Sequence, residues 1–279
     1  MQISQPPQRS PKSKQAPKLA IDLLAHYRSV MMQTLTVVDL ETSGFTAERD
    51  RIIEISVLVG NLESGILHQK TDLINPECEI SYDAIRFTSI TQPMLDYAPT
   101  AAEVLPDYLS LLGNGILTAH NLSSDYKFLQ AESKRLGIDF RRSNHETLCT
   151  VQLSRLLLPE LRSRRLPALV RYFGFGNNID SSINKNTSNS TSHRAAANAL
   201  TCWQLVQRLL KEIHQESDRN LLARIHKQWL NLSQIAEILD CTEVEAQLEL
   251  VKAGLRSRPV GRSGELLYQR GGVESIIAG

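Results

Sequence analysis

The chain has 279 residues, of which 42% are hydrophobic, and its formal net charge at pH 7 is +1. These values leave room for one large domain and one small one, and they exclude a globally basic nucleic-acid-binding protein. The four cysteines are scattered without a CxxC pair, and no apolar run reaches the ~20 residues of a membrane span, so we expect a cytoplasmic protein that does not enter a membrane.

The N-terminal part divides into a tail and a helix. Residues 1–18 contain four basic residues, four prolines and no acid, which predicts a disordered basic tail. From residue 19 to 33, apolar side chains recur at helical spacing and predict a docking helix, with the pattern carried by Leu19, Leu23, Leu24 and Tyr27.

The segment from 34 to 215 alternates strand and helix patterns. Three strands come first, and their short connections predict antiparallel neighbours: 34–40, 51–60 and 66–75. One further strand (115–120) and several helices follow, the helices being expected at 101–113, 121–137, 147–158, 163–174 and 195–213. This order predicts an α/β fold in which helices flank a mixed sheet.

Two acids end the first strand. In TVVDLETSG (36–44), Asp39 and Glu41 are two residues apart, so both side chains point to the same face of the strand. Crowded carboxylates are costly unless a cation or a proton relieves the repulsion. The alternative is that both are solvated strand-end residues.

A third acid points to the same place. Asp125 lies in the first turn of the helix expected at 121–137, and the apolar Phe128 and Leu129 put it on the inward face. The alternative is an acid that only stabilises the start of the helix. Three oxygen ligands without sulfur suit Mg²⁺ or Mn²⁺, and two such ions are a known arrangement for displacement at phosphorus.

Three segments resemble, in order, the motifs of the DnaQ-like DEDDh 3′–5′ exonucleases, a family that includes the proofreading epsilon subunit of bacterial DNA polymerase III. They are VVDLETSG (37–44), HNLSSD (120–125) and HRAAAN (193–198). The resemblance implies a ribonuclease H-like fold and the removal of nucleotides from 3′ ends with two divalent metal ions. It also implies that Asp39, Glu41 and Asp125 are metal ligands and that His193 is the general base.

The third motif departs from the family pattern, because Asn198 stands where the family has an Asp. Helical spacing still directs Asn198 toward the site, where its amide would be a metal ligand without the charge. We also expect Thr42, His120 and Asn121 near the nucleic acid. For Thr42 the alternative is capping of a local turn, and for His120 and Asn121 it is ordering of the strand-to-helix turn.

Two further segments complete the chain. The Ser- and Asn-rich insert 176–192 is expected to be mobile. Residues 217–279 predict a winged helix-turn-helix-like domain, with two helices followed by a hairpin. Acids on its second helix would repel a DNA groove, whereas four arginines lie on and around the hairpin: Arg256, Arg258, Arg262 and Arg270.

Two classes of function remain open from the sequence. The first is a metal-dependent exonuclease of the proofreading or repair type that acts on DNA or RNA 3′ ends. The second is a catalytically poor module that binds nucleic acid or protein on an exonuclease fold, because Asn198 weakens the charge of the site. In either class, residues 217–279 have two alternatives: they bind another protein such as a DNA polymerase subunit, or the arginines around the hairpin contact phosphates.

Overall fold

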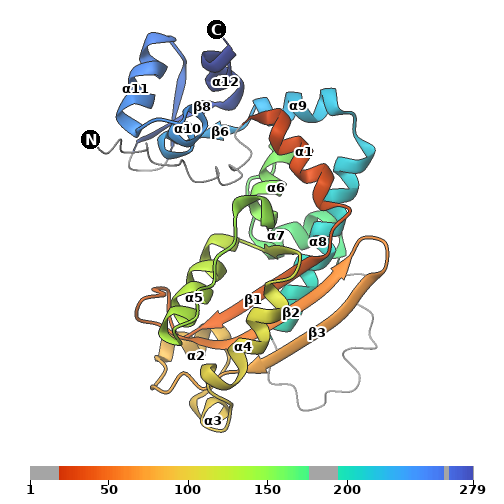
Figure 1. The fold of residues 1–279 in the computed structure, drawn as a ribbon, viewed down its shortest axis with the longest axis vertical. Coiled ribbons are helices and arrows are strands. Elements are labelled where there is room, and N and C mark those ends of the chain that lie inside the picture. Colours follow the sequence, from red (N-terminus) through yellow and green to blue (C-terminus); the bar gives the residue numbers. More distant parts are fainter. Residues whose placement is uncertain (1–18, 176–193, 261–263, 279) are drawn as a thin grey trace, which may run out of the picture.

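The centre of the protein is a mixed β-sheet. The computed structural model describes residues 19–175, 194–260 and 264–278. Within them, five strands pair in the order β3-β2-β1-β4-β5 (Figure 1). β1, β2 and β3 are antiparallel neighbours, whereas β4 is parallel to β1 and β5 is parallel to β4. Their bounds are β1 Leu35–Thr42, β2 Ile52–Asn61, β3 Gly65–Leu73, β4 Ile116–Ala119 and β5 Thr147–Cys149.

The predicted α/β class with a mixed sheet is confirmed, and one predicted element is corrected. Residues 147–158 were expected to be a single helix, but residues 147–149 form β5 and the helix α6 begins only at Thr150 (Thr150–Leu157). Pairing with the end of β4 aligns Leu117 with Thr147 and Ala119 with Cys149. A strand of three residues is too short to show a period, so this tertiary pairing decides its conformation.

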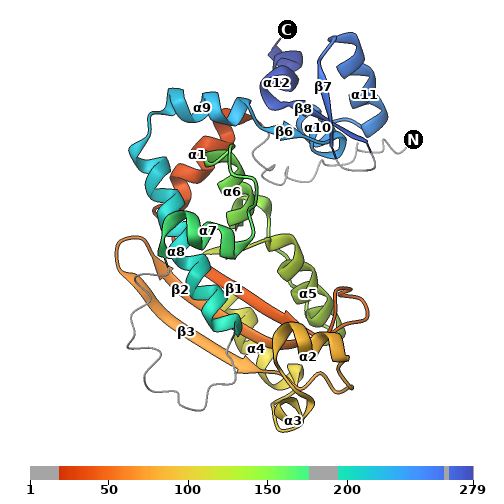
Figure 2. The same ribbon diagram turned by 180° about the vertical axis from the view of Figure 1, so that it is seen from behind.

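Helices cover both faces of the sheet. On one face, α4 (Ala101–Leu112) and α5 (Leu122–Arg135) pack over alternate strand residues that include Val38 and Val57. The opposite face, seen in Figure 2, is covered by α7 and the long helix α8 together with α1 and α6. The bounds of these helices are α7 Leu166–Phe173, α8 Arg194–Gln215 and α1 Ala20–Val30.

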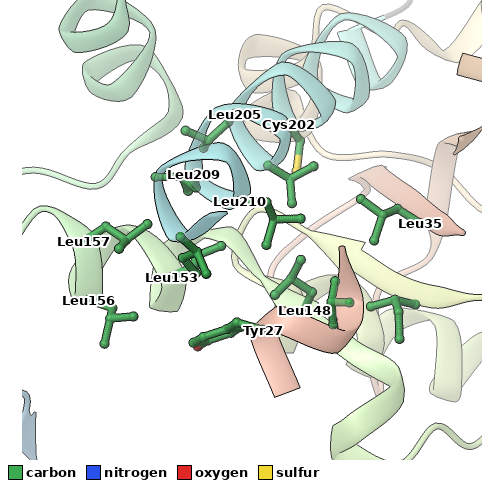
Figure 3. Close-up of a cluster of buried hydrophobic side chains, with 14 of the residues drawn as sticks. Tyr27, Leu35, Leu148, Leu153, Leu156, Leu157, Cys202, Leu205, Leu209 and Leu210 are labelled. Atoms are coloured by element: carbon green, nitrogen blue, oxygen red, sulfur yellow. The ribbon is translucent and has the colours of Figure 1, made fainter. Parts of the chain in front are cut away.

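The core on the α8 face fixes the position of that helix. Tyr27 from α1, Leu148 from β5 and Leu153 from α6 gather around Leu209 and Leu210 of α8 (Figure 3). All five side chains are at least 95% buried, which stabilises the fold by roughly 1.5–3 kcal/mol for each aliphatic side chain. The predicted docking helix α1 is therefore part of this core, and α8 is held firmly above the strand that carries the acid pair.

A short helical region closes the end of the sheet where β1 finishes. It contains α2 (Tyr82–Thr88) and α3 (Gln92–Leu95), whereas the 3-10 helix η1 (Asn144–Glu146) lies at the opposite end, where the parallel strands β4 and β5 begin. The N-terminus of α2 is capped by Ser81, whose hydroxyl accepts the backbone N–H of Ala84. The helix α2 lies against β1, so its C-terminal end borders the acid pair.

The C-terminal segment has its own small core and its own sheet, in which the order is β6-β8-β7. Two helices followed by a hairpin are present as expected, and β6 and α12 were not foreseen. Arg270, one of the four arginines expected on and around the hairpin, follows β8, but its side chain is buried and donates hydrogen bonds to Gln228 and Glu274. The elements are β6 Trp229–Leu230, α10 Leu232–Leu239, α11 Glu243–Lys252, β7 Ser257–Val260, β8 Glu265–Gln269 and α12 Arg270–Ala278.

The helix α9 (Asp218–His226) joins the two parts and belongs to the first core. Leu221 and Ile225 are fully buried in the same cluster as α1 and α8. The hydrophobic clusters therefore favour a domain boundary after α9, at about residue 227, instead of the predicted one at 217.

Four sequence predictions fall on residues outside the described ranges: the basic tail 1–18, the insert 176–192, the general base His193 and the hairpin residue Arg262. Among the helices that the structure describes, none combines the length and the hydropathy needed to span a bilayer.

Candidate active site

The acid pair lies at the end of β1 and faces α8. Alternation along the strand puts Asp39 and Glu41 on the same face as the buried Leu35 and Val37, which pack under α8. The side chain of Glu41 is only 13% exposed. Both acids therefore lie on one face of β1, as predicted, and they are not freely solvated strand-end residues.

Asp125 approaches the same strand end from α5. Phe128 and Leu129 are buried, so the helix turns Asp125 inward as its spacing predicted. The carboxylate forms backbone hydrogen bonds with Leu40, at the centre of the acid pair, and with its own residue, and these bonds lower its pKa. A third carboxylate therefore reaches the two on β1.

Burial and mutual repulsion raise the pKa values of all three acids. For Asp39, the pKa is well above its usual range because of burial first and the charges of Asp125 and Glu41 next. Burial raises the pKa of Glu41 to about 7, although the Arg194 guanidinium opposes this shift. The pKa of Asp125 is also raised to about 7, mainly by burial. A site in which three carboxylates resist ionisation together is suited to a bound cation.

Asn198 lies where the spacing on α8 placed it. Its Nδ2 donates a hydrogen bond to Asp39 Oδ2 at 3.2 Å. The helical stripe that it shares is buried against the sheet, as predicted, and consists of Ala195, Ala199, Cys202 and Val206. This hydrogen bond lowers the pKa of Asp39, but a neutral amide contributes no negative charge to a metal site.

Two charged residues at the site were missed by the sequence reasoning. Glu54 is fully buried on β2, directly opposite Glu41 in the strand register, and its Oε2 accepts the backbone N–H of Ala195 at 2.9 Å. Arg194, the first residue of α8, forms an ion pair with Glu41 at 3.1 Å. The available signal for Glu54 was an acid in the middle of the apolar run RIIEISVLVG; for Arg194 there was none beyond its place in the third motif.

The three residues expected near nucleic acid differ in their surroundings. The Thr42 hydroxyl donates to the Gly44 carbonyl at 2.6 Å, a local turn contact. Both ring nitrogens of His120 are hydrogen-bonded, to the Thr150 hydroxyl at 2.8 Å and to the Arg164 carbonyl at 2.9 Å, and burial lowers the pKa of its imidazole. Asn121 is exposed and has a left-handed backbone (φ 73°) at the start of α5. These contacts favour a structural role for His120.

An exposed aromatic pair lies next to the acids. Phe45 follows the acid motif and is 87% exposed, and Phe87 at the end of α2 is 48% exposed. Their rings meet edge to face with centroids 6.1 Å apart, and the guanidinium of Arg86 lies 5.1 Å from the Phe87 ring centroid. Large aromatic side chains exposed as a pair present apolar ring surface to solvent, which is unusual unless a ligand covers it.

The donor set of the site fits a hard divalent cation. Asp39, Glu41 and Asp125 offer carboxylate oxygens, the ligands that Mg²⁺ and Mn²⁺ prefer, and their raised pKa values reflect charge that such an ion would neutralise. Within the described part of the chain, the three carboxylates lie near enough to shift one another's pKa values but do not yet have the arrangement of a metal-binding group.

A mixed sheet that collects carboxylates at one strand end defines the class: an α/β protein with the donor chemistry of metal-assisted displacement at phosphorus. The family follows from the sequence comparison. The family model RNase_T, described as "Exonuclease", matches residues 36–206, which is more than half of the chain. The chain belongs to this family, the DnaQ-like DEDDh exonucleases. The family typically uses two divalent metal ions.

Curated relatives include polymerase components. The chain is 34% identical over 195 residues to the PolC-type DNA polymerase III of Oceanobacillus iheyensis, covering 69% of the chain and 13% of that protein. It is 31% identical over 182 residues to the DNA polymerase III subunit epsilon of Aquifex aeolicus, covering 64% of the chain and 82% of that protein. A putative bifunctional exonuclease/endonuclease protein of Mycobacterium tuberculosis is 30% identical over 248 residues, covering 86% of the chain and 35% of that protein. The chain spans only a small part of the PolC-type relatives from Oceanobacillus iheyensis and Clostridium perfringens, 13% and 12% of their length.

Solved structures share the fold. Exonuclease I from Methylocaldum szegediense superposes with a TM-score of 0.54 at 18% identity, covering 74% of this chain and 45% of that one. Exonuclease I of E. coli in complex with a 5cy-dA13 oligonucleotide gives a TM-score of 0.52 at 17% identity, covering 72% and 44%. The mixed sheet with its flanking helices is therefore an exonuclease fold.

Proposed function

We propose that this protein is a metal-dependent 3′–5′ exonuclease that hydrolyses the terminal phosphodiester bond of DNA. The observation that carries the proposal is the crowding of Asp39, Glu41 and Asp125 at one strand end, with the pKa of each raised. DNA is favoured over RNA because relatives are named as DNA polymerase III components and a protein of the same fold binds a deoxyadenosine oligonucleotide. A proofreading or repair role follows from the same relatives.

The roles of Asp39, Glu41, Asp125 and Asn198 are proposed from their positions and from the family motifs, and that of His193 from the third motif alone. Asp39, Glu41 and Asp125, with the amide of Asn198, would hold two Mg²⁺ or Mn²⁺ ions, and His193 would act as the general base. Bound there, the ions would activate water and stabilise the charge that develops at phosphorus. Glu54 anchors the start of α8 through Ala195 and so keeps the third motif above the sheet.

The aromatic pair gives the 3′-terminal nucleotide a place to bind. Phe45 and Phe87 are exposed beside the carboxylates, and base–aromatic stacking contributes roughly 1–3 kcal/mol per base in single-strand binding proteins. Stacking does not depend on base identity, which suits an enzyme that removes any terminal nucleotide. Thr42 and Asn121 are proposed to lie near the same nucleotide, and His120 is proposed to order the turn that carries Asn121.

A direct test uses the purified protein with single-stranded and 3′-recessed DNA and RNA oligonucleotides, first in Mg²⁺ and then in Mn²⁺. We expect stepwise shortening from the 3′ end of DNA and no reaction in EDTA. The absence of cleavage by wild-type protein in both metals, under conditions where the oligonucleotide binds, would reject the proposal.

That result would support the second candidate, a catalytically poor binding module on the exonuclease fold. Asn198 is the observation that favours it, because an amide Nδ2–H group lies beside Asp39 at the position where the family has a carboxylate. Binding of a labelled oligonucleotide without shortening, in wild-type protein and in an Asn198→Asp variant alike, distinguishes this function from the first.

For the C-terminal segment we propose a winged-helix-like domain that docks another protein, such as a polymerase subunit. On its second helix, α11, the exposed side chains include Glu243, Val244 and Leu248, which do not suit the phosphates of a DNA groove. Deletion of residues 228–279 should therefore leave the affinity for duplex DNA unchanged. A cytoplasmic location is proposed as well, since all four cysteines are free.

A further inference from the structure

Arg194 connects the acid cluster to α2. Its Nε lies 3.1 Å from Glu41 Oε1, and its Nη1 donates to the backbone carbonyl of Phe87. The Arg194 side chain is 52% exposed, whereas that of Glu41 is 13% exposed. The guanidinium thus stands at the rim of the site, with a buried carboxylate on one side and solvent on the other.

Local folding does not call for a cation at this position. Arg194 is the first described residue of α8, where the positive end of the helix dipole disfavours a cation. The first turn of α8 carries no acid that would offset this cost. The ion pair with Glu41 offsets the unfavourable interaction of Arg194 with the helix dipole. The position of Arg194 is therefore explained by the acid cluster and not by the stability of α8.

The same guanidinium lies between the carboxylates and the aromatic pair. Its Nε contacts the Glu41 carboxylate, and its Nη1 donates to the backbone carbonyl of Phe87, whose ring packs against that of Phe45. A nucleotide whose base contacts the two rings, and whose phosphate faces the acids, would bring that phosphate to Arg194. Guanidinium groups bind phosphate through two parallel hydrogen bonds, so an entering phosphate would compete with Glu41 for Arg194.

We propose that Arg194 exchanges partners when a strand binds: it holds Glu41 in the free protein and moves to a backbone phosphate of the entering 3′ end, which releases Glu41 to a divalent cation. The inference rests on the proposed function, because it requires both the strand and the cation. Since the guanidinium and the cation compete for one carboxylate, binding of the strand and binding of the metal favour each other.

The first test measures Mn²⁺ binding without nucleic acid, by electron paramagnetic resonance of free Mn²⁺. Arg194→Ala should bind Mn²⁺ about threefold to tenfold more tightly than wild type, because its competitor for Glu41 is gone. Arg194→Lys should fall between the two. The matched control is Arg141→Ala, which removes an 81% exposed arginine paired with Asp139, away from the site. Equal affinities in wild type and Arg194→Ala would overturn the inference.

The second test measures binding of a fluorescent ten-nucleotide thymidine oligomer in EDTA at several salt concentrations. Loss of one phosphate contact should weaken binding of Arg194→Ala about tenfold and reduce the slope of log K against log[salt] by about 0.7. A merely structural role would not change the slope. Arg194→Lys should retain it, as should Arg141→Ala, and an unchanged slope in Arg194→Ala would count against the phosphate contact.

Neither test depends on cleavage, so the two proposals fail separately. If both shifts occur but wild-type protein cleaves nothing in Mg²⁺ or Mn²⁺, the exonuclease function is rejected and the exchange at Arg194 stands. If wild type cleaves DNA while Arg194→Ala changes neither the Mn²⁺ affinity nor the salt slope, the exchange alone is rejected.

Discussion

The first turns of α8 and α11 differ in the sign of the charged residues that they place at the positive end of the helix dipole. At α11, Thr242 and Glu245 form a capping box and Glu243 also lies in the first turn, so acids lie where the helix dipole favours them. At α8, an arginine begins the helix and three buried carboxylates crowd in front of it. Charged residues whose position is unfavourable within their own helix indicate a functional site. Charged residues that stabilise their own helix indicate a surface that serves stability.

Removal of a carboxylate at the α8 site should have the largest effect. We expect Asp39→Ala to lower the cleavage rate by at least about 10³-fold, since a metal ligand stabilises the transition state by several kcal/mol. Circular dichroism should show an intact fold. Asp139→Ala, which removes an exposed acid paired with Arg141, is the control and should cleave like wild type. Wild-type rates in Asp39→Ala would show that the crowded acids do not hold the metal.

Restoring a charge at the same site should have the opposite effect. Asn198→Asp changes one group at nearly constant volume and adds a carboxylate beside Asp39. We expect the rate in low Mg²⁺ to rise at least about tenfold, which corresponds to ~1.4 kcal/mol of barrier. Single-turnover rates across a Mg²⁺ series measure this effect. Asn198→Ala serves as the comparison, and a rate for Asn198→Asp at or below that of wild type would place the limitation elsewhere.

Two truncations locate the end of the first region. Deletion of residues 228–279 removes the small C-terminal core and should leave a folded exonuclease domain. Deletion of residues 217–279 also removes Leu221 and Ile225, which are fully buried in the first core. Each such residue contributes about 2–5 kcal/mol, so the shorter chain should melt at least about 10 °C lower. Thermal unfolding measured by circular dichroism compares them, and equal Tm values would return the boundary to residue 217.

The smallest effect concerns the metal-free stability of the crowded site. The folded-state pKa values of Glu41 and Asp125 are about 7, above those of the unfolded chain, so their repulsion is present above pH 7 and disappears as pH falls through 7. In EDTA at pH 8, Asp39→Asn should raise Tm by a few °C, roughly 1 kcal/mol or more. At pH 5.5 the gain should shrink, because Glu41 and Asp125, whose pKa values are about 7, are then mostly protonated and no longer repel Asp39. A gain that is equal at both pH values would contradict the repulsion.

Much of the site could be predicted because it depends on local periods. The two-residue period of a strand put Asp39 and Glu41 on one face, and the 3.6-residue period of a helix turned Asp125 and Asn198 inward. The contact of Asn198 with Asp39, 159 residues apart in sequence, confirms the direction of Asn198, although no period could supply the distance.

The sequence by itself determined the first four strands and the longer helices of residues 34–213, the face of Asp39, Glu41 and Asp125, and the family motifs, because each of these depends on residues close together along the chain. Only the tertiary structure decided that Glu54 anchors α8, that Arg194 pairs with Glu41 and borders Phe87, and that residues 147–149 form a strand. It also assigned α9 to the first core. These features depend on which distant segments meet, and that is settled by packing of the whole core, not by any local pattern.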